Sequence, residues 1–160
     1  MHFEHLVQIN DPQLPLLDPL SRAQLWRGLV RRAEQPEEFI LALDSCHIVG
    51  RRSEGEATVL ERNLDFGPFQ VRDIVTLHPQ SEVSTLAAAT ERWPESRMRI
   101  LIEEPEPDAL FLRFRYEWAD DAAGGEVDAM AQDLRKQAYL SADLDTVARI
   151  RELAQAGLLD

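Results

Sequence analysis

Hydrophobic and polar positions alternate along most of this chain. Residues 2–10 show a two-residue period, with Phe3, His5 and Val7 on one side, as in a half-buried β-strand. The same period governs the stretch from about residue 44 to residue 118, where SEGE, FGP, HPQSE, WPES and EPEPD interrupt it as turn sequences. The interruptions predict six further strands, at 44–52, 56–65, 69–78, 82–92, 97–103 and 109–118. Because the connections are short, consecutive strands are expected to pair antiparallel.

A helical period of 3.6 residues follows the first strand. Ser21 and Gln24 fit a capping box, in which each side chain satisfies a backbone amide of the first turn. Gly28 lies within the apolar stripe of this helix and weakens it by about 1 kcal/mol relative to alanine. We therefore expect a close contact or a bend at Gly28. A second short helix is expected at QPEEF, residues 35–39, because proline suits a first helical turn.

The helical period returns from residue 126 to about residue 156. The register of its apolar stripe shifts near Ser141, which predicts a kink or a restart of the helix there. The strands at 97–103 and 109–118 have one apolar and one charged face, and a sheet with one apolar face needs a covering element. The C-terminal helix is the only long apolar helix available. The expected fold is therefore α+β and helix-grip: a curved seven-stranded antiparallel sheet wrapped around a long C-terminal helix, with two short helices after the first strand, in a single domain over 1–160.

A strongly curved sheet that grips one helix rarely fills the space between them, so we expect an apolar pocket with a few polar groups. The apolar residues expected to line this pocket are Val71, Met98, Ile100, Leu112, Phe114, Met130 and Leu134. The strand faces in 44–65 are uncertain by one residue, and such a slip would exchange every inward side chain for its neighbour.

Three polar residues share the apolar strand faces and are candidates for binding or acid–base chemistry. His5 is either a functional group in the pocket or a buried histidine satisfied by the backbone or by water. Asp73 either points inward, where burial raises a carboxyl pKa, or is turned outward by a bulge. Tyr116 either orients a polar group of a ligand or packs in the core with its hydroxyl bonded at the rim.

Composition and charge exclude several classes of protein. The net charge is −12, which disfavours nucleic acid and anionic membrane surfaces as partners. Cys46 is the only cysteine, so no intramolecular disulfide forms, and its neighbour His47 points to the opposite strand face. The four histidines have no metal-binding spacing, and no Gly-rich phosphate loop is present, so we expect no metal and no cofactor. The chain has no secretory signal and no membrane-spanning run, which predicts a cytoplasmic protein without membrane insertion.

Four stretches resemble a known family. They are FEHLVQIND at 3–11, LSRAQLWRGLVRRAEQPEEF at 20–39, FGPFQVRD at 66–73 and AYLSADLDTVARIREL at 138–153. Together with the order of elements they resemble the START-like, helix-grip (SRPBCC) superfamily, which includes polyketide cyclases, lipid-transfer domains and birch-pollen-allergen relatives. More narrowly, the chain is similar to the AtaL-like subfamily, whose members are mostly bacterial and of unknown function. The resemblance implies a hydrophobic ligand pocket under the C-terminal helix and carries over no catalytic residues.

Three functions are compatible with this pattern. The leading hypothesis is a module that binds a small hydrophobic or aromatic molecule between the sheet and the C-terminal helix. The second is a polyketide cyclase- or aromatase-like enzyme on the same fold, with His5, Asp73 and Tyr116 as the residues to test. The third is a peptide- or protein-interaction module, in which Trp26 of the first helix would be exposed. The sequence does not decide whether the chain is an enzyme, and it leaves the ligand and the oligomeric state open.

Overall fold

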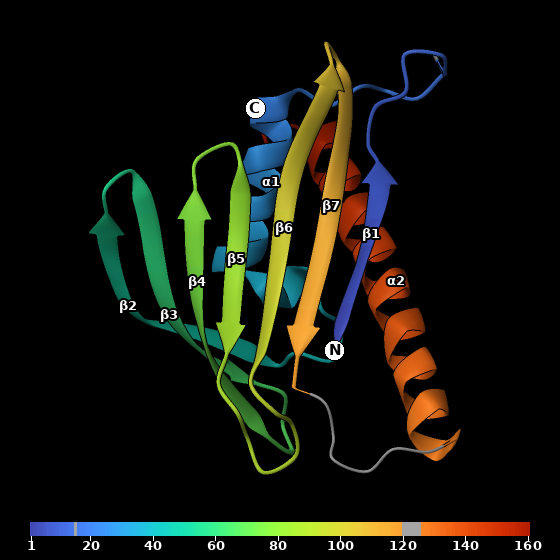
Figure 1. The fold of residues 1–160 in the computed structure, drawn as a ribbon. Coiled ribbons are helices and arrows are strands. Elements are labelled where there is room, and N and C mark those ends of the chain that lie inside the picture. Colours follow the sequence, from blue (N-terminus) through green and yellow to red (C-terminus); the bar gives the residue numbers. More distant parts are fainter. Residues whose placement is uncertain (15, 120–125) are drawn as a thin grey trace.

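The computed structural model describes residues 1–14, 16–119 and 126–160, with residues 126–128 described by their backbone alone. The described residues form one seven-stranded antiparallel sheet and two α-helices (Figure 1). In chain order the elements are β1 (His2–Gln8), α1 (Arg22–Glu34), the 3-10 helix η1 (Pro36–Glu38), β2 (Ser45–Glu54), β3 (Ala57–Asp65), β4 (Gln70–His78), β5 (Glu82–Ala87), β6 (Ser96–Glu106), β7 (Ala109–Trp118) and α2 (Glu126–Gln155). The α+β helix-grip fold expected from the sequence is confirmed.

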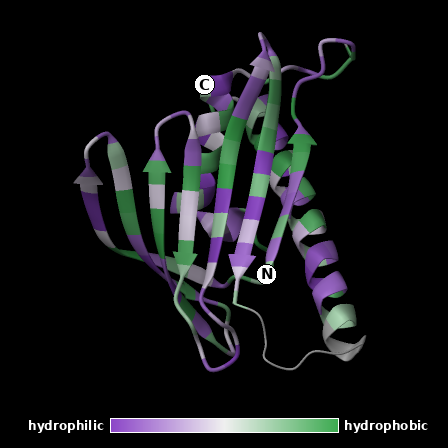
Figure 2. Ribbon diagram, in the orientation of Figure 1, coloured by the Kyte–Doolittle hydropathy of each residue, from purple (hydrophilic) through white to green (hydrophobic). Residues whose placement is uncertain are grey.

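The sheet has the strand order β1-β7-β6-β5-β4-β3-β2, so the first strand of the chain pairs with the last. Both α-helices lie on the same side of it (Figure 1). Ile100 of β6 pairs with Phe114 of β7, and both side chains point to the helical side, where they are buried. Hydrophobic and hydrophilic residues alternate along these strands in Figure 2, as the two-residue period predicts.

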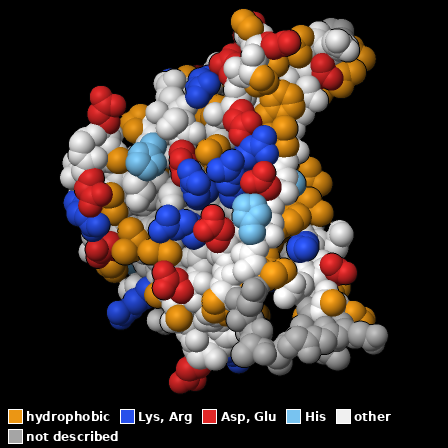
Figure 3. All heavy atoms as spheres, in the orientation of Figure 1, with side chains coloured by type: hydrophobic (Ala, Val, Ile, Leu, Met, Phe, Trp, Pro, Cys, Tyr) orange, Lys and Arg blue, Asp and Glu red, His pale blue; other side chains and the backbone are white. Residues whose placement is uncertain are grey.

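The opposite face of the sheet is charged. Figure 3 shows basic and acidic side chains gathered over its central strands. They form ion pairs across neighbouring strands: Arg99 bonds Glu82 at 2.6 Å, and Arg113 bonds both Glu103 and Glu4. This pairing explains how the arginines that alternate with the apolar residues of β6 and β7 are accommodated on the solvent side.

The structure shortens one predicted strand. The two-residue period predicted a strand over 82–92, but β5 ends at Ala87. Residues 88–95 form a loop in which the Thr90 side chain accepts hydrogen bonds from the backbone amides of Arg92 and Trp93, at 3.2 and 3.0 Å. A side chain that bonds nearby amides in this way favours a turn over continued strand pairing.

The helices follow their sequence signals closely. The capping box of α1 is present, with both reciprocal bonds between Ser21 and Gln24. A Cβ atom added to Gly28 would lie 2.8 Å from the side chain of Ile150 in α2, so the close contact expected at this glycine is confirmed. The second helix, α2, runs without interruption through Ser141, and the restart expected there does not occur. No helix in the described part of the chain is both long and apolar enough to cross a lipid bilayer.

The core occupies one end of the space between sheet and helices. Within the part of α2 whose side chains are described, the buried residues are Asp143, Thr146, Val147, Ile150 and Leu153, all in its C-terminal half. The three apolar ones, Val147, Ile150 and Leu153, belong to the same core cluster as α1 and the inner faces of β6 and β7. By contrast, Met130 and Leu134 in the N-terminal half of α2 are 68% and 69% exposed. One end of the sheet–helix space is therefore filled and the other is not.

Candidate functional site

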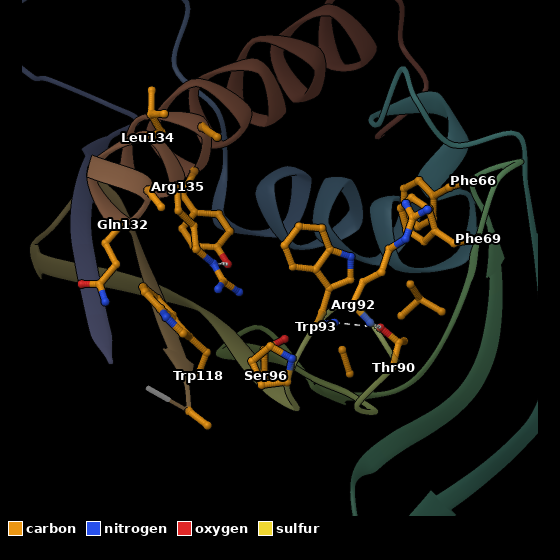
Figure 4. A pocket seen from close by; sticks show the side chains of 17 residues that line it. Phe66, Phe69, Thr90, Arg92, Trp93, Ser96, Trp118, Gln132, Leu134 and Arg135 are labelled. Carbon is orange, nitrogen blue, oxygen red and sulfur yellow. Dashed lines mark hydrogen bonds between the residues drawn. The ribbon is translucent and has the colours of Figure 1, made fainter. Parts of the chain in front are cut away.

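A cavity of about 830 Å³ lies between the N-terminal half of α2 and the adjacent end of the sheet (Figure 4). Its lining comes from α2, from the ends of β4, β5, β6 and β7, and from the β3–β4 and β5–β6 loops. Aromatic side chains dominate the lining, namely Phe66, Phe69, Trp93, Trp118 and Tyr139. The apolar face of the sheet therefore covers both a packed core and a hollow.

The β3–β4 loop places two aromatic rings on one side of the cavity. The Phe66 amide donates to the carbonyl of Phe69 at 3.0 Å, and Gly67 adopts a φ of +92° within this turn. Glycine adopts a left-handed conformation without steric cost, which permits so tight a turn. The rings of Phe66 and Phe69 stack at a centroid distance of 5.0 Å. The FGP motif is thus a turn that presents a pair of phenylalanines.

The opposite side is built by β7 and α2. Arg135 donates from Nε to the Tyr139 hydroxyl at 2.9 Å, and its guanidinium carbon lies 4.4 Å from the centroid of the Trp118 ring. Such a cation–π contact stabilises a guanidinium that has lost part of its water. Tyr139 in turn stacks on Tyr116 at a centroid distance of 3.8 Å. In Figure 4, Trp93 lies between Trp118 and Arg135 on one side and the phenylalanine pair on the other.

Behind Tyr139, a chain of hydrogen bonds leads into the interior. The Tyr116 hydroxyl donates to Oδ1 of Asp143 at 2.5 Å, and Nε2 of His5 lies 2.7 Å from Oδ2 of the same carboxyl. Burial raises the pKa of Asp143 above its ordinary value, although the bonds from Tyr116 and His5 act in the opposite direction. Burial and the nearby carboxylate raise the pKa of Tyr116 as well, so its hydroxyl stays protonated and remains a donor.

A second polar cluster joins α1 to the sheet. Arg62 of β3 and Asp73 of β4 form a buried bidentate pair, with N–O distances of 2.8 and 2.7 Å. Arg62 also donates to the carbonyl of Ala33 at the end of α1, at 2.7 Å. Arg32 of α1 donates to the Thr146 hydroxyl of α2 at 3.4 Å, and burial lowers the pKa of Arg32. These contacts hold α1 to both the sheet and α2.

The structure places the apolar residues expected to line the pocket in four different surroundings. Val71 and Leu134 line the cavity. Ile100, Leu112 and Phe114 are almost completely buried in the packed core. Met98 packs against the edge of that core, whereas Met130 is exposed to solvent. The cavity and the expected pocket therefore overlap at one end only, because the apolar strand faces near α1 are covered by tightly packed helices.

His5 and Tyr116 point inward, as the alternation predicted. Of the two orientations left open for Asp73, the structure shows the inward one, and each of the three residues has a partner. His5 and Tyr116 meet at Asp143, and Asp73 is paired with Arg62. No bulge turns Asp73 outward, since β3 and β4 pair in regular register from Thr58 to Asp65. Asp73 is accordingly a paired carboxylate inside the protein.

Several residues of the site were missed by the sequence analysis. Tyr139 and Asp143 are four residues apart, a spacing that places them on the same face of a helix. Trp118 continues the inward alternation of β7 by one step beyond Tyr116. Arg92 and Trp93 were missed because the two-residue period assigned Arg92 to the end of a predicted strand and Trp93 to the WPES turn, whereas both lie in the β5–β6 loop.

Other chemistries find no support in the described residues. Within them, no group of three or more His, Cys, Asp or Glu side chains is placed to hold a metal ion. Cys46 is half-buried while His47 is exposed, consistent with opposite strand faces. Burial raises the pKa of the Cys46 thiol, which disfavours the nucleophilic thiolate.

Comparison with known protein families gives a match over residues 7–157 to the family described as Acetylaranotin biosynthesis cluster protein L, or AtaL. The chain belongs to the AtaL family. Its resemblance to AtaL-like proteins, inferred from four stretches of sequence, is confirmed. A comparison of this AtaL-family chain with curated protein sequences gives no match.

Solved structures show that this AtaL-family protein shares its fold with START-like proteins. The di-domain ARO/CYC StfQ from the steffimycin biosynthetic pathway superposes with a TM-score of 0.69 at 8% identity over 97% of this chain. The chain spans about half of StfQ, covering 51% of it. The Zhui aromatase/cyclase from Streptomyces sp. R1128 gives 0.63 at 12% identity, covering 98% of this chain and 97% of that one. A START superfamily protein from Mycobacterium smegmatis superposes with a TM-score of 0.61 at 13% identity, and the match covers 95% of this chain and 98% of that protein.

Proposed function

We propose that this protein binds a small apolar or aromatic molecule in the cavity between the N-terminal half of α2 and the sheet. The observation that carries the proposal is the 830 Å³ volume with five aromatic side chains in its lining. Pockets for small organic ligands have volumes of about 300–1,000 Å³ and are mostly apolar with a few placed polar groups. The lining here has that composition, with Thr90, Ser96 and Gln132 among its polar members.

The aromatic lining favours a flat ligand. In Figure 4, Phe66 and Phe69 stand on one side, Trp118 on the other, and Trp93 projects between them. The ring of Tyr139, which also lines the cavity, lies 5.9 Å from that of Trp118. Rings at such positions stack on a planar guest, and each aromatic pair contributes about 0.5–1.5 kcal/mol beyond the area that it buries. The partner is thus a small hydrophobic molecule.

The test uses a neutral fluorescent probe, 1-pyrenebutanol, whose pyrene accepts energy from tryptophan. Two of the three tryptophans, Trp93 and Trp118, line the cavity, so a bound pyrene quenches their emission. We expect saturable binding of one probe per chain. Replacing both Ala131 and Ala138, which line the cavity from α2, with phenylalanine fills the cavity and weakens binding about tenfold or more.

A matched variant controls for the added aromatic surface on α2. Ala142 and Ala148 are exposed residues of the same helix that do not line the cavity, and phenylalanine at both positions leaves the affinity unchanged. Absence of saturable binding by the wild type, or equal binding by the two double variants, overturns the proposal. A native mass spectrum of the protein from its own host, compared with its denatured mass, then weighs any resident ligand.

A cyclase- or aromatase-type reaction is the second candidate. The observation that favours it is the chain of hydrogen bonds His5–Asp143–Tyr116, which reaches the cavity wall through the stacked Tyr139. Such groups move protons while the cavity holds a reactive chain in a folded conformation. Turnover of a poly-β-ketone substrate that persists unchanged after alanine replacement of His5, Asp73 and Tyr116 removes these residues from consideration.

A further inference from the structure

The cavity lining has a charge opposite to that of the protein. The whole chain has 29 Asp and Glu against 17 Lys and Arg, but the described lining contains two arginines and no acidic residue. We propose that the ligand carries a negative charge beside its apolar or aromatic body, and that Arg135 binds this charge. The inference rests on the proposed function, since it names the class of molecule that the same cavity takes.

Arg135 is held in a position suited to an anion. Its Nε donates to the Tyr139 hydroxyl at 2.9 Å, and its guanidinium carbon lies 4.4 Å from the centre of the Trp118 ring. These two contacts fix the side chain from one side and leave both terminal nitrogens, Nη1 and Nη2, without a hydrogen bond to any described residue. A guanidinium with a free planar edge binds a carboxylate through two parallel hydrogen bonds.

The lack of a carboxylate partner distinguishes Arg135 from most arginines of this protein. The arginines on the outer face of the sheet, such as Arg99 and Arg113, are paired with glutamates of neighbouring strands. Arg135 has no ion pair with a residue in the part of the chain that the structure describes, although it is half-buried. The hydrogen bond to Tyr139 and the contact with the Trp118 ring replace only part of the solvation that this half-buried cation has lost, and neither supplies a negative charge. An anionic ligand would supply the missing partner.

Arg92 adds a second positive charge to the lining, from the β5–β6 loop. Its guanidinium carbon lies 5.7 Å from the Phe69 ring, and it too has no ion pair with a described residue. Figure 4 places Arg92 beside the phenylalanine pair and Arg135 across the cavity. The two arginines therefore do not share one carboxylate. Arg135 binds the anionic group, whereas Arg92 raises the positive potential that an anion meets on entry.

The experiment compares two probes that differ in one functional group. 1-Pyrenebutyrate is the carboxylate counterpart of 1-pyrenebutanol, and both are followed by quenching of tryptophan emission. We expect the wild type to bind the carboxylate about tenfold more tightly than the alcohol at neutral pH, because one charge-assisted hydrogen-bonded pair contributes an effect of about this size. Arg135→Gln should abolish this preference by weakening the carboxylate alone.

Two further variants make the result specific. Arg97→Gln removes one positive charge from an exposed position of β6 that does not line this cavity, and it should keep the full preference. Arg135→Lys keeps the charge but loses the planar edge, and it should retain part of the preference.

The outcomes separate this inference from the proposed function. Equal affinity of the wild type for both probes would overturn the anion preference and leave the apolar pocket standing. If Arg135→Gln weakened the binding of both probes equally, Arg135 would only hold the shape of the cavity wall, and the inference would again fail. Binding of neither probe would overturn both.

Discussion

Arg62 and Asp73 form an ion pair inside the protein. Both are buried, and each is the other's counter-ion. Removing one member of a buried ion pair leaves an uncompensated charge in the interior, which costs about 3–5 kcal/mol. Asp73→Ala should therefore lower the free energy of unfolding by that amount, measured by urea denaturation with circular dichroism.

An exposed pair of the same chemistry provides the control for Asp73→Ala. Arg149 and Glu152 form an ion pair at 3.0 Å on the surface of α2. Glu152→Ala should cost less than about 1 kcal/mol, because water solvates the remaining arginine. Similar losses of unfolding free energy in the two variants would show that burial does not determine how much the Arg62–Asp73 pair contributes to stability.

Asp143 makes stability depend on pH. It faces His5 from β1, Tyr116 from β7 and Arg32 from α1. Because burial raises its pKa in the folded state, the folded protein holds this proton more tightly than the unfolded chain does. Its contribution to stability is therefore fully present below the unfolded pKa of about 3.9 and is lost as the pH rises through the raised value.

The comparison with Asp143→Asn isolates this contribution from all other carboxyl groups. The free energy of unfolding of the wild type minus that of the variant should decrease as the pH rises from about 4. Urea denaturation at a series of pH values measures both quantities. A difference that stays constant or increases with pH would contradict the assignment.

At the residue scale, the sequence predicts to which face of the sheet a side chain points, but not which residue it bonds. Two-residue alternation placed His5, Asp73 and Tyr116 on the inner face of the sheet, and all three point inward. It could not predict that His5 and Tyr116 share Asp143, because that carboxyl comes from α2, 138 residues from His5 in the chain. Pairing across such a separation depends on how the elements pack.

The contact between α1 and α2 depends on the absence of one methyl group. Alanine at position 28 would favour the helix by about 1 kcal/mol, but its Cβ would lie 2.8 Å from the Ile150 side chain. Overpacking of this kind costs about 1–3 kcal/mol. We expect Gly28→Ala to destabilise the protein on balance, as measured by its thermal midpoint and urea denaturation.

A double-mutant cycle tests the cause of this loss. Ile150→Ala alone opens a cavity in the core and costs about 2–5 kcal/mol. When both changes are combined, the added methyl group occupies part of that space, so the double variant should be more stable than the sum of the single losses implies. Strict additivity would show that the two residues do not interact.

At the scale of elements, periodicity predicted seven strands and their antiparallel order, and local signals predicted the start of α1. Periodicity gave wrong element boundaries where a local hydrogen bond or packing against a neighbouring helix determines the conformation. The strand expected over 82–92 ends at Ala87, because Thr90 bonds the amides of a turn. The shift of stripe near Ser141 reflects a change in what α2 covers: the cavity before that point, and α1 with the core after it.

At the scale of the whole molecule, the position of the cavity could not be read from the sequence. The expected pocket lining extended over the whole apolar face. The space above Ile100, Leu112 and Phe114 is instead occupied by side chains of α1 and of the C-terminal half of α2. How far a helix covers a curved sheet depends on the crossing of elements far apart in the chain. The pattern of apolar and polar residues does not show how far the helix extends, since strand residues that face a cavity and strand residues that face a packed core are equally apolar.

The uneven packing of α2 has a consequence for access to the cavity. Among the side chains of α2 that the structure describes, the buried ones lie from Asp143 to Leu153, so the helix is anchored in its C-terminal half, whereas residues 129–138 are mostly exposed. Displacing that free end breaks few buried contacts and leaves the core intact, so it requires less free energy than unfolding the protein. We therefore expect a guest molecule to enter by a hinged displacement of one helix end. The rate of exchange would then follow the local stability of α2, independently of the melting temperature of the protein.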